Sequence, residues 1–103
     1  MNDREPVYAI AVVARLTGMH PQTLRKYERA GLLTPARHGG QRQYSNADVR
    51  RLRRIQYLVE ERGLNVAGLE LTFSMVDRLD DVGQDASLED LRAAIEDVLR
   101  LSS

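Results

Sequence analysis

Apolar residues recur at helical spacing in several stretches of the chain, and glycine, proline or polar residues separate these stretches. The first stretch predicts a short strand leading into a short helix, with the apolar residues Val7, Ile10, Val13, Ala14 and Leu16. This helix stops at Gly18, and a second begins at Pro21, because proline at the first helical position presets φ. The second helix runs to Ala30, where Gly31 suits a left-handed cap. Two short helices joined in this way have the spacing of a helix-turn-helix.

The segment TPARHGGQRQY, residues 34–44, predicts a β-hairpin after the second helix. Gly39-Gly40 suits a two-residue turn that needs positive φ. In that register Arg37 lies opposite Arg42, and like charges directly opposite each other destabilise a pair of strands. A phosphate between the two side chains would relieve the repulsion. The alternative is a longer loop in which both arginines extend into water.

Two further helices follow the hairpin. Ser45 and Asp48 form a capping box before a third helix, whose apolar stripe is Val49, Leu52, Ile55 and Val59 and which ends near Gly63. Asn65 can cap a fourth helix, with Val66, Leu69, Phe73 and Val76 on one side. The segment DDVGQDA, residues 80–86, then interrupts the pattern.

A last helix is predicted from Ser87, paired with Asp90 in a second capping box, to about Leu101. Its apolar residues have the 3-4-3 spacing of a coiled-coil seam and are Leu88, Leu91, Ile95 and Val98. A helix of this length is marginal alone, so the seam must pack against something. We favour a second copy of the chain; the alternative is that the helix folds back on its own winged helix.

The charge is distributed unevenly along a chain of zero formal net charge. Residues 1–62 carry 12 Lys and Arg against 6 Asp and Glu, whereas residues 63–103 carry 3 against 9. A basic half that meets a polyanion is one interpretation, and electrostatic pairing of the two halves is the other. The 103 residues have the length of one domain, cysteine is absent, and neither a signal peptide nor an apolar run of about 18 residues is present. These features predict a cytoplasmic, nucleoid-associated protein without a membrane partner.

The motifs TLRKYERAGLL, residues 23–33, and RQYSNADVRRLRRIQ, residues 42–56, resemble the DNA-binding domain of MerR-type regulators. GMHPQTLR and GLNVAGLELT make the chain similar to the HspR-type heat-shock repressors within that family. The resemblance covers about residues 7–73. It implies a mainly α, winged helix-turn-helix domain over residues 1–73, and we expect residues 74–103 to form an acidic extension with a dimerisation helix over about 87–101.

The resemblance implies a homodimeric repressor of chaperone genes that binds an inverted repeat in double-stranded DNA, with the chaperone DnaK as a candidate corepressor. A recognition helix over about 21–30 would enter the major groove, and a basic wing over about 35–44 would contact the backbone. The residues expected at DNA are His20, Gln22, Thr23, Arg25, Lys26, Tyr27, Arg37, Arg42, Tyr44 and Arg53. The residues expected at the dimer interface are Leu88, Leu91, Ile95 and Val98.

Several of these residues have an alternative role. Arg25 could instead pair with Glu28, Tyr27 shares the apolar face of Leu24 and suits packing, and His20 suits a helix cap as well as a phosphate. The arginines of residues 50–54 could form a solvated face, with Arg53 among those that could add a phosphate contact. The chain departs from the family at Ala11, where a serine or threonine N-cap is expected, and at Gln41, where an aromatic residue is usual.

Enzymatic activity is not expected, because the sequence has no nucleophile–base pair, metal-ligand cluster or glycine-rich phosphate loop. No cofactor and no metal are predicted. Two other functions remain open: a protein-binding module similar to the CbpM-type chaperone modulators, and an architectural DNA-binding protein. The basic second helix and the two wing arginines together favour sequence-specific repression.

Overall fold

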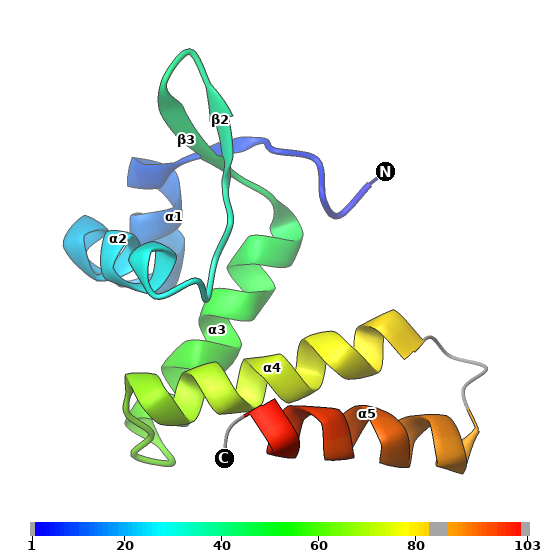
Figure 1. The fold of residues 1–103 in the computed structure, drawn as a ribbon. Coiled ribbons are helices and arrows are strands. Elements are labelled where there is room, and N and C mark those ends of the chain that lie inside the picture. Colours follow the sequence, from blue (N-terminus) through cyan, green and yellow to red (C-terminus); the bar gives the residue numbers. More distant parts are fainter. Residues whose placement is uncertain (1, 83–86, 102–103) are drawn as a thin grey trace. The chain divides into compact units, whose positions relative to one another are not determined.

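The computed structural model describes residues 2–82 and 87–101 and divides the chain into two compact units, separated between Leu64 and Asn65. The elements, in chain order (Figure 1), are β1 (Tyr8–Ala9), α1 (Ile10–Thr17), α2 (Pro21–Arg29), β2 (Ala36–His38), β3 (Gln41–Tyr44), α3 (Asn46–Glu60), α4 (Val66–Val82) and α5 (Leu88–Leu101). The mainly helical fold with a small antiparallel sheet is confirmed. The units divide before α4, whereas the boundary expected at residue 73 falls inside that helix.

The first two helices have the predicted ends. Gly18 has a φ of 72° and terminates α1 in the left-handed conformation. The side chain of His20 caps α2, because its Nδ1 accepts a hydrogen bond of 3.0 Å from the backbone N–H of Gln22. Pro21 occupies the first turn, and Gly31 follows the helix with a φ of 78°. The helix-turn-helix therefore forms from signals that are local in sequence.

The start of α1 differs from the expectation. The N-cap residue is Ala9 rather than Ala11, and its side chain makes no cap hydrogen bond. The preceding strand is instead paired with β3, and Val7 N–H donates to the carbonyl oxygen of Tyr44 at 3.0 Å. Two apolar residues of this segment, Val7 and Leu16, are 54% and 46% exposed. The buried residues of α1 are Val13 and Thr17, four positions apart, so the side of the helix that carries Leu16 faces solvent.

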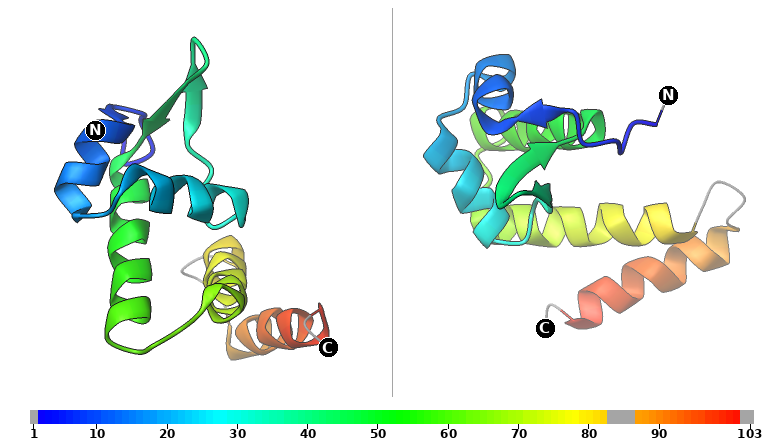
Figure 2. Two further views of the ribbon diagram at one scale, coloured as in Figure 1. Left: turned by 90° about the vertical axis from the view of Figure 1, so that its left-hand side faces the viewer. Right: turned by 90° about the horizontal axis from the view of Figure 1, so that it is seen from above.

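The sheet has the strand order β1-β3-β2, with β2 and β3 forming a hairpin that projects from the helices of the first unit (Figures 1 and 2). Gly39 and Gly40, with φ of 59° and 81°, form its two-residue turn. Below it, α3 begins with the predicted capping box of Ser45 and Asp48. Side chains from every helix of this unit, from β3 and from the segment between α2 and β2 form the core, chiefly Val13, Leu24, Leu33, Tyr44, Leu52 and Ile55.

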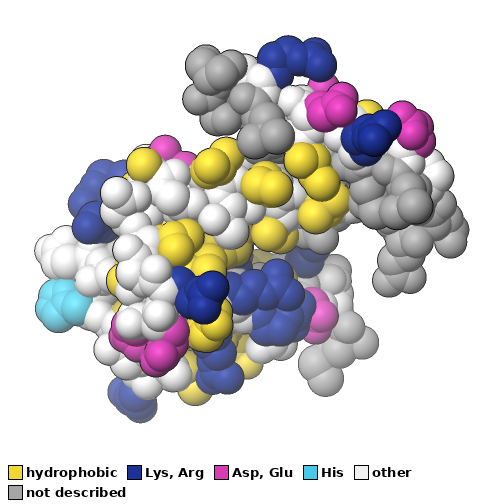
Figure 3. Space-filling view, turned by 90° about the horizontal axis from the view of Figure 1, so that it is seen from below, with side chains coloured by type: hydrophobic (Ala, Val, Ile, Leu, Met, Phe, Trp, Pro, Cys, Tyr) yellow, Lys and Arg dark blue, Asp and Glu magenta, His cyan; other side chains and the backbone are white. Residues whose placement is uncertain are grey.

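The second unit is a pair of helices. Asn65 caps α4 through a hydrogen bond of 2.9 Å from Gly68 N–H to its Oδ1, and Ser87 and Asp90 form the capping box of α5. The two helices run antiparallel and side by side (Figures 1 and 2), and Arg78 pairs with Asp97 across them at 3.3 Å. Some hydrophobic side chains remain at the surface of the protein, and Figure 3 shows a group of them on one face. In α4, Leu71 is 38% exposed.

Candidate nucleic-acid interface

The α2 helix has a buried side and an exposed side. Leu24 and Tyr27 are 0% and 7% exposed and belong to the core. The exposed residues are Gln22, Lys26 and Arg29, at positions i, i+4 and i+7, so they follow one face of the helix. This face therefore presents one amide and two cations to solvent, a combination that can contact base edges and phosphates.

The N-terminus of α2 carries the other residues expected at DNA. His20 is exposed, and its use of Nδ1 as the helix cap leaves Nε2 as the remaining polar atom of the ring. Thr23 and Arg25 are both half-buried. The structure thus places the expected residues of this helix in one short segment, with Gln22, Lys26 and His20 the most accessible of them.

The wing has the predicted register. In the register of β2 and β3, Arg37 lies opposite Arg42 and His38 lies opposite Gln41. This register excludes the alternative of a longer loop with separated arginines. The two cations consequently lie on neighbouring strands. A counter-charge is needed to stabilise this arrangement.

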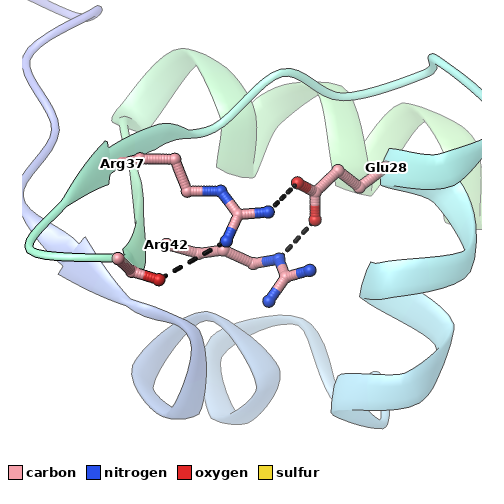
Figure 4. A network of polar contacts seen from close by, with 4 residues as sticks. Glu28, Arg37 and Arg42 are labelled. Atoms are coloured by element: carbon pink, nitrogen blue, oxygen red, sulfur yellow. Dashed lines mark hydrogen bonds and ion pairs between the residues drawn. The ribbon is translucent and has the colours of Figure 1, made fainter.

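That counter-charge is the carboxylate of Glu28 in α2 (Figure 4). One carboxylate oxygen accepts a hydrogen bond of 3.0 Å from Nη2 of Arg37, and the other accepts from Nε of Arg42. Arg37 also reaches the carbonyl oxygen of Gly40 at the turn, at 3.5 Å. The expected phosphate between the arginines is therefore replaced by a side chain of the protein. Within the described residues Glu28 forms its ion pairs with the wing, and not with Arg25.

The pKa of Glu28 reflects this position. Burial raises the pKa of the carboxyl. The hydrogen bond from Arg42 and the charges of Arg42 and Arg37 lower it by more, so the pKa lies below its ordinary value. The hydrogen bond to Glu28 in turn raises the pKa of Arg42. Glu28 is therefore ionised at neutral pH, and charge-assisted hydrogen bonds connect the wing to α2.

The two tyrosines expected at DNA lie in the core. Tyr44 is 0% exposed and Tyr27 is 7% exposed, so neither ring is on the surface. Among the described residues, the hydroxyl of Tyr44 has no hydrogen-bond partner. Burial, followed by the charge of Glu28, raises the pKa of Tyr44. The position of Tyr44 in β3, two residues after Arg42, indicates a packing role beneath the wing rather than a surface contact.

The arginine cluster of α3 is divided between internal and exposed roles. Arg50 pairs with Asp3 at 3.1 Å, and Nε of Arg51 donates to the carbonyl oxygen of Leu32 at 2.6 Å. Arg53 and Arg54 are exposed. Two of the four arginines thus stabilise the first unit, and Arg53 remains accessible to a partner.

The expected dimerisation residues all belong to α5. Ile95 is half-buried, whereas the side chains of Leu88, Leu91 and Val98 lie outside what the structure describes. In the same chain, α5 packs beside α4. This packing corresponds to neither expectation in full: the helix folds back within its own unit, and a role of the seam between two copies stays a prediction.

In residues 2–82 and 87–101, no group of three or more His, Cys, Asp or Glu side chains is placed to bind a metal ion. Over the same ranges, no helix combines the length and apolar content that a membrane span requires.

Glu28 is the residue of this site that sequence patterns did not assign to it, whereas the spacing of Lys26 and Arg29 already predicted phosphate contacts. A signal for Glu28 existed, since a single acidic residue follows two cations in α2 and the hairpin register called for a counter-charge. What the sequence could not supply is the distance between α2 and the wing, which depends on tertiary packing.

Comparison with known proteins agrees with this arrangement. Residues 8–75 match the family described as MerR HTH family regulatory protein. A Streptomyces coelicolor protein assigned the name heat shock protein HspR is 38% identical over 97 residues, which are 93% of this chain and 63% of that protein. The transcriptional repressor CarA of Myxococcus xanthus is 41% identical over 61 residues, 56% of this chain and 21% of its own length.

A third relative, the transcriptional regulator GlnR of Bacillus anthracis, is 29% identical over 102 residues, which are 92% of this chain and 78% of that protein. The chain thus spans less than two thirds of the HspR and CarA proteins and more than three quarters of GlnR. The matched region contains the whole helix-turn-helix and the wing. From the family match and these relatives, the chain belongs to the MerR HTH family of regulatory proteins and is similar in sequence to HspR.

Proposed function

We propose that the chain is a sequence-specific DNA-binding repressor of heat-shock or chaperone genes. The observation that carries the proposal is the joined basic surface of the first unit: the exposed face of α2 and the paired arginines of the wing, connected through Glu28. In a winged helix-turn-helix, the second helix enters the major groove and reads base edges with its N-terminal residues. The accessible side chains of α2 have the chemistry for that role.

Each part of the surface has a distinct task in this proposal. The amide of Gln22 can bond an adenine bidentately and discriminate against the wrong base by about 1–3 kcal/mol. Lys26 and Arg29 contact phosphates beside the groove, and Arg37 and Arg42 contact the backbone from the wing. His20 and Thr23 lie at the helix end nearest the bases, and Arg53 adds a phosphate contact from α3.

The proposed repression of heat-shock genes rests on the relatives. The chain is similar to a protein named HspR and to a protein named as a transcriptional repressor. A palindromic site requires a protein with two-fold symmetry. We therefore propose that two copies bind an inverted repeat, with the apolar seam of α5 as the interface. A chaperone such as DnaK is the proposed corepressor, and the cytoplasm is the proposed compartment.

Two variants test the assignment of reading and contact roles. We expect Gln22→Ala to weaken binding to a cognate duplex while binding to a scrambled duplex stays unchanged, because only a base contact carries sequence information. We expect Arg42→Ala to weaken binding to both duplexes and to reduce the slope of log affinity against log salt by about one. Fluorescence anisotropy at 50 and 200 mM salt measures both quantities.

Arg62→Ala is the matched control for Arg42→Ala, since Arg62 is exposed and follows α3 at the end away from the wing (Figure 1). We expect it to leave the salt slope unchanged. Equal losses on both duplexes for Gln22→Ala would contradict its role in base reading, and an unchanged slope for Arg42→Ala would remove the wing from the interface.

A further inference from the structure

The contact between Glu28 and the wing places an acidic side chain inside a surface proposed to bind a polyanion. The side chain of Glu28 is 18% exposed, that of Arg42 24% and that of Arg37 50%. Both carboxylate oxygens are used, one on each arginine. The carboxylate is therefore an integral part of the wing surface.

This carboxylate competes with DNA for the same donors. A guanidinium has five N–H donors. Arg42 uses Nε for Glu28, and its two terminal nitrogens point away from the carboxylate (Figure 4). Arg37 uses Nη2 for Glu28 and Nη1 for the turn carbonyl of Gly40. A phosphate at the wing thus meets two arginines whose combined charge is already reduced by one.

The same contact fixes the position of the wing on the recognition helix. Glu28 lies one turn after Leu24 in α2, and its two partners lie on the two strands of the hairpin. Without the carboxylate, the opposed arginines would repel each other, and both guanidinium groups would lose the hydrogen-bond acceptor that they share. A fixed wing loses less conformational freedom when it binds, which favours the one DNA geometry that it matches.

We propose that Glu28 is a specificity-determining residue, which positions the wing for a matched site and withholds part of its charge from unmatched DNA. The inference rests on the proposed function, DNA binding through α2 and the wing. Affinity for unmatched DNA comes almost entirely from phosphate contacts. The negative charge of Glu28 weakens these contacts, and on unmatched DNA no other interaction compensates for the lost affinity. On a matched site the gain from a positioned wing offsets that cost. Glu28 therefore widens the ratio between matched and unmatched affinity.

Glu28→Gln tests the proposal because it removes the charge and retains the shape of the side chain. We expect the variant to bind a scrambled duplex more tightly than wild type at 50 mM salt. Binding of the variant releases about one more counterion, which makes the slope of log affinity against log salt steeper by about 0.9. Between 50 and 200 mM salt, the affinity of the variant should therefore fall about threefold more than that of wild type. The ratio of cognate to scrambled affinity is expected to fall.

Two further variants separate charge from structure. Glu61→Gln makes the same change of charge at an exposed residue just after α3, and we expect wild-type slope and ratio. Glu28→Asp keeps the charge on a shorter side chain that cannot bridge both arginines. Its slope should stay at the wild-type value while its cognate-to-scrambled ratio falls. Circular dichroism spectra of all variants establish that each is folded before titration.

The probes are a duplex from upstream of the protein's own gene and a scrambled duplex of the same composition, titrated by anisotropy. A uniform loss of affinity in Glu28→Gln, with an unchanged salt slope, would overturn the proposal, because a purely structural residue acts in that way. If wild type binds and Glu28→Gln keeps both slope and ratio, this inference alone is wrong. If wild type binds neither duplex at 50 mM salt, the proposed function is wrong and the inference falls with it.

Discussion

At the scale of single residues, two tyrosines on paired strands differ in the bonding of their hydroxyl groups. Tyr8 of β1 lies opposite Tyr44 of β3. The hydroxyl of Tyr8 donates to Oδ1 of Asn46 at 2.8 Å, whereas that of Tyr44, among the described residues, has no partner. An unpaired polar group in a core costs free energy, and a paired one contributes to stability. The same substitution should therefore have different effects at the two positions.

We expect Tyr44→Phe to leave the free energy of unfolding unchanged or to raise it by about 1 kcal/mol, because the variant removes an unpaired buried hydroxyl. The matched control, Tyr8→Phe, should lower the free energy of unfolding by about 1 kcal/mol through loss of its hydrogen bond. Urea denaturation followed by circular dichroism measures both. A loss in Tyr44→Phe as large as that in Tyr8→Phe would show that the Tyr44 hydroxyl is bonded.

Glu28 makes the stability of the first unit depend on pH. Its folded-state pKa lies below the ordinary value of 4.5, so its contribution is fully present above that pH and is lost as the pH falls through the lowered pKa. We expect Glu28→Gln to be less stable than wild type at pH 7, and the difference to shrink as the pH falls below about 4.5. Urea denaturation of both proteins from pH 7 to pH 3 measures the difference. A difference independent of pH would contradict the ion pairs with the wing.

Individual residues also show what a sequence can predict. The cap roles of His20, Ser45 and Asn65 involve partners two or three positions away, so the local pattern contained the answer. Glu28 reaches residues 9 and 14 positions away, and the pairing depends on how the hairpin packs on α2. Tyr44 looked available because it ends the wing motif, but its strand turns the ring into the core.

At the scale of elements, the wing hairpin and α3 are joined by a capping box. Oγ of Ser45 accepts a hydrogen bond of 3.1 Å from Asp48 N–H, and Oδ2 of Asp48 accepts one of 2.8 Å from Ser45 N–H. Ser45 directly follows Tyr44, the last residue of β3. The cap therefore fixes the start of α3 at the base of the wing as well as satisfying the N–H groups of the helix.

We expect Ser45→Ala to lower the free energy of unfolding by about 1 kcal/mol, the usual cost of losing a serine N-cap. Ser74→Ala is the control, because Ser74 is an exposed residue inside α4 whose hydroxyl donates to the carbonyl oxygen of Glu70 in the same helix. The control should change stability by a few tenths of a kcal/mol at most. Thermal and urea unfolding measure both variants, and equal effects at the two serines would contradict the role of the capping box.

The elements were predicted from sequence to different degrees. The hairpin register followed from Gly39-Gly40, because a two-residue turn allows a single pairing of the residues on either side of it. The pairing of β1 with β3 was not predicted, because it joins residues 34 and 36 positions apart and has no turn signal between them. That pairing explains how α1 begins at Ile10 without a side-chain cap at Ala9.

At the scale of the whole molecule, the charge distribution and family membership both support the proposed DNA partner. The first 62 residues carry the excess of Lys and Arg, and they contain α2 and the wing. A basic surface of this kind attracts nucleic acid, and relatives named as a transcriptional repressor and a transcriptional regulator are similar to it in sequence. The resemblance implies the assembly of two copies on an inverted repeat. This assembly stays a prediction, because the side chains of most seam residues lie outside the described structure.

The most direct test of the central claim is an anisotropy titration of the wild-type protein with a duplex from upstream of its own gene and with a scrambled duplex, at 50 and 200 mM salt. We predict two protein copies per cognate duplex, an affinity at least 1,000-fold (~10³) above that for the scrambled duplex, and a steep fall with salt. Equal affinity for both duplexes, or no binding at 50 mM salt, would contradict sequence-specific repression through α2 and the wing.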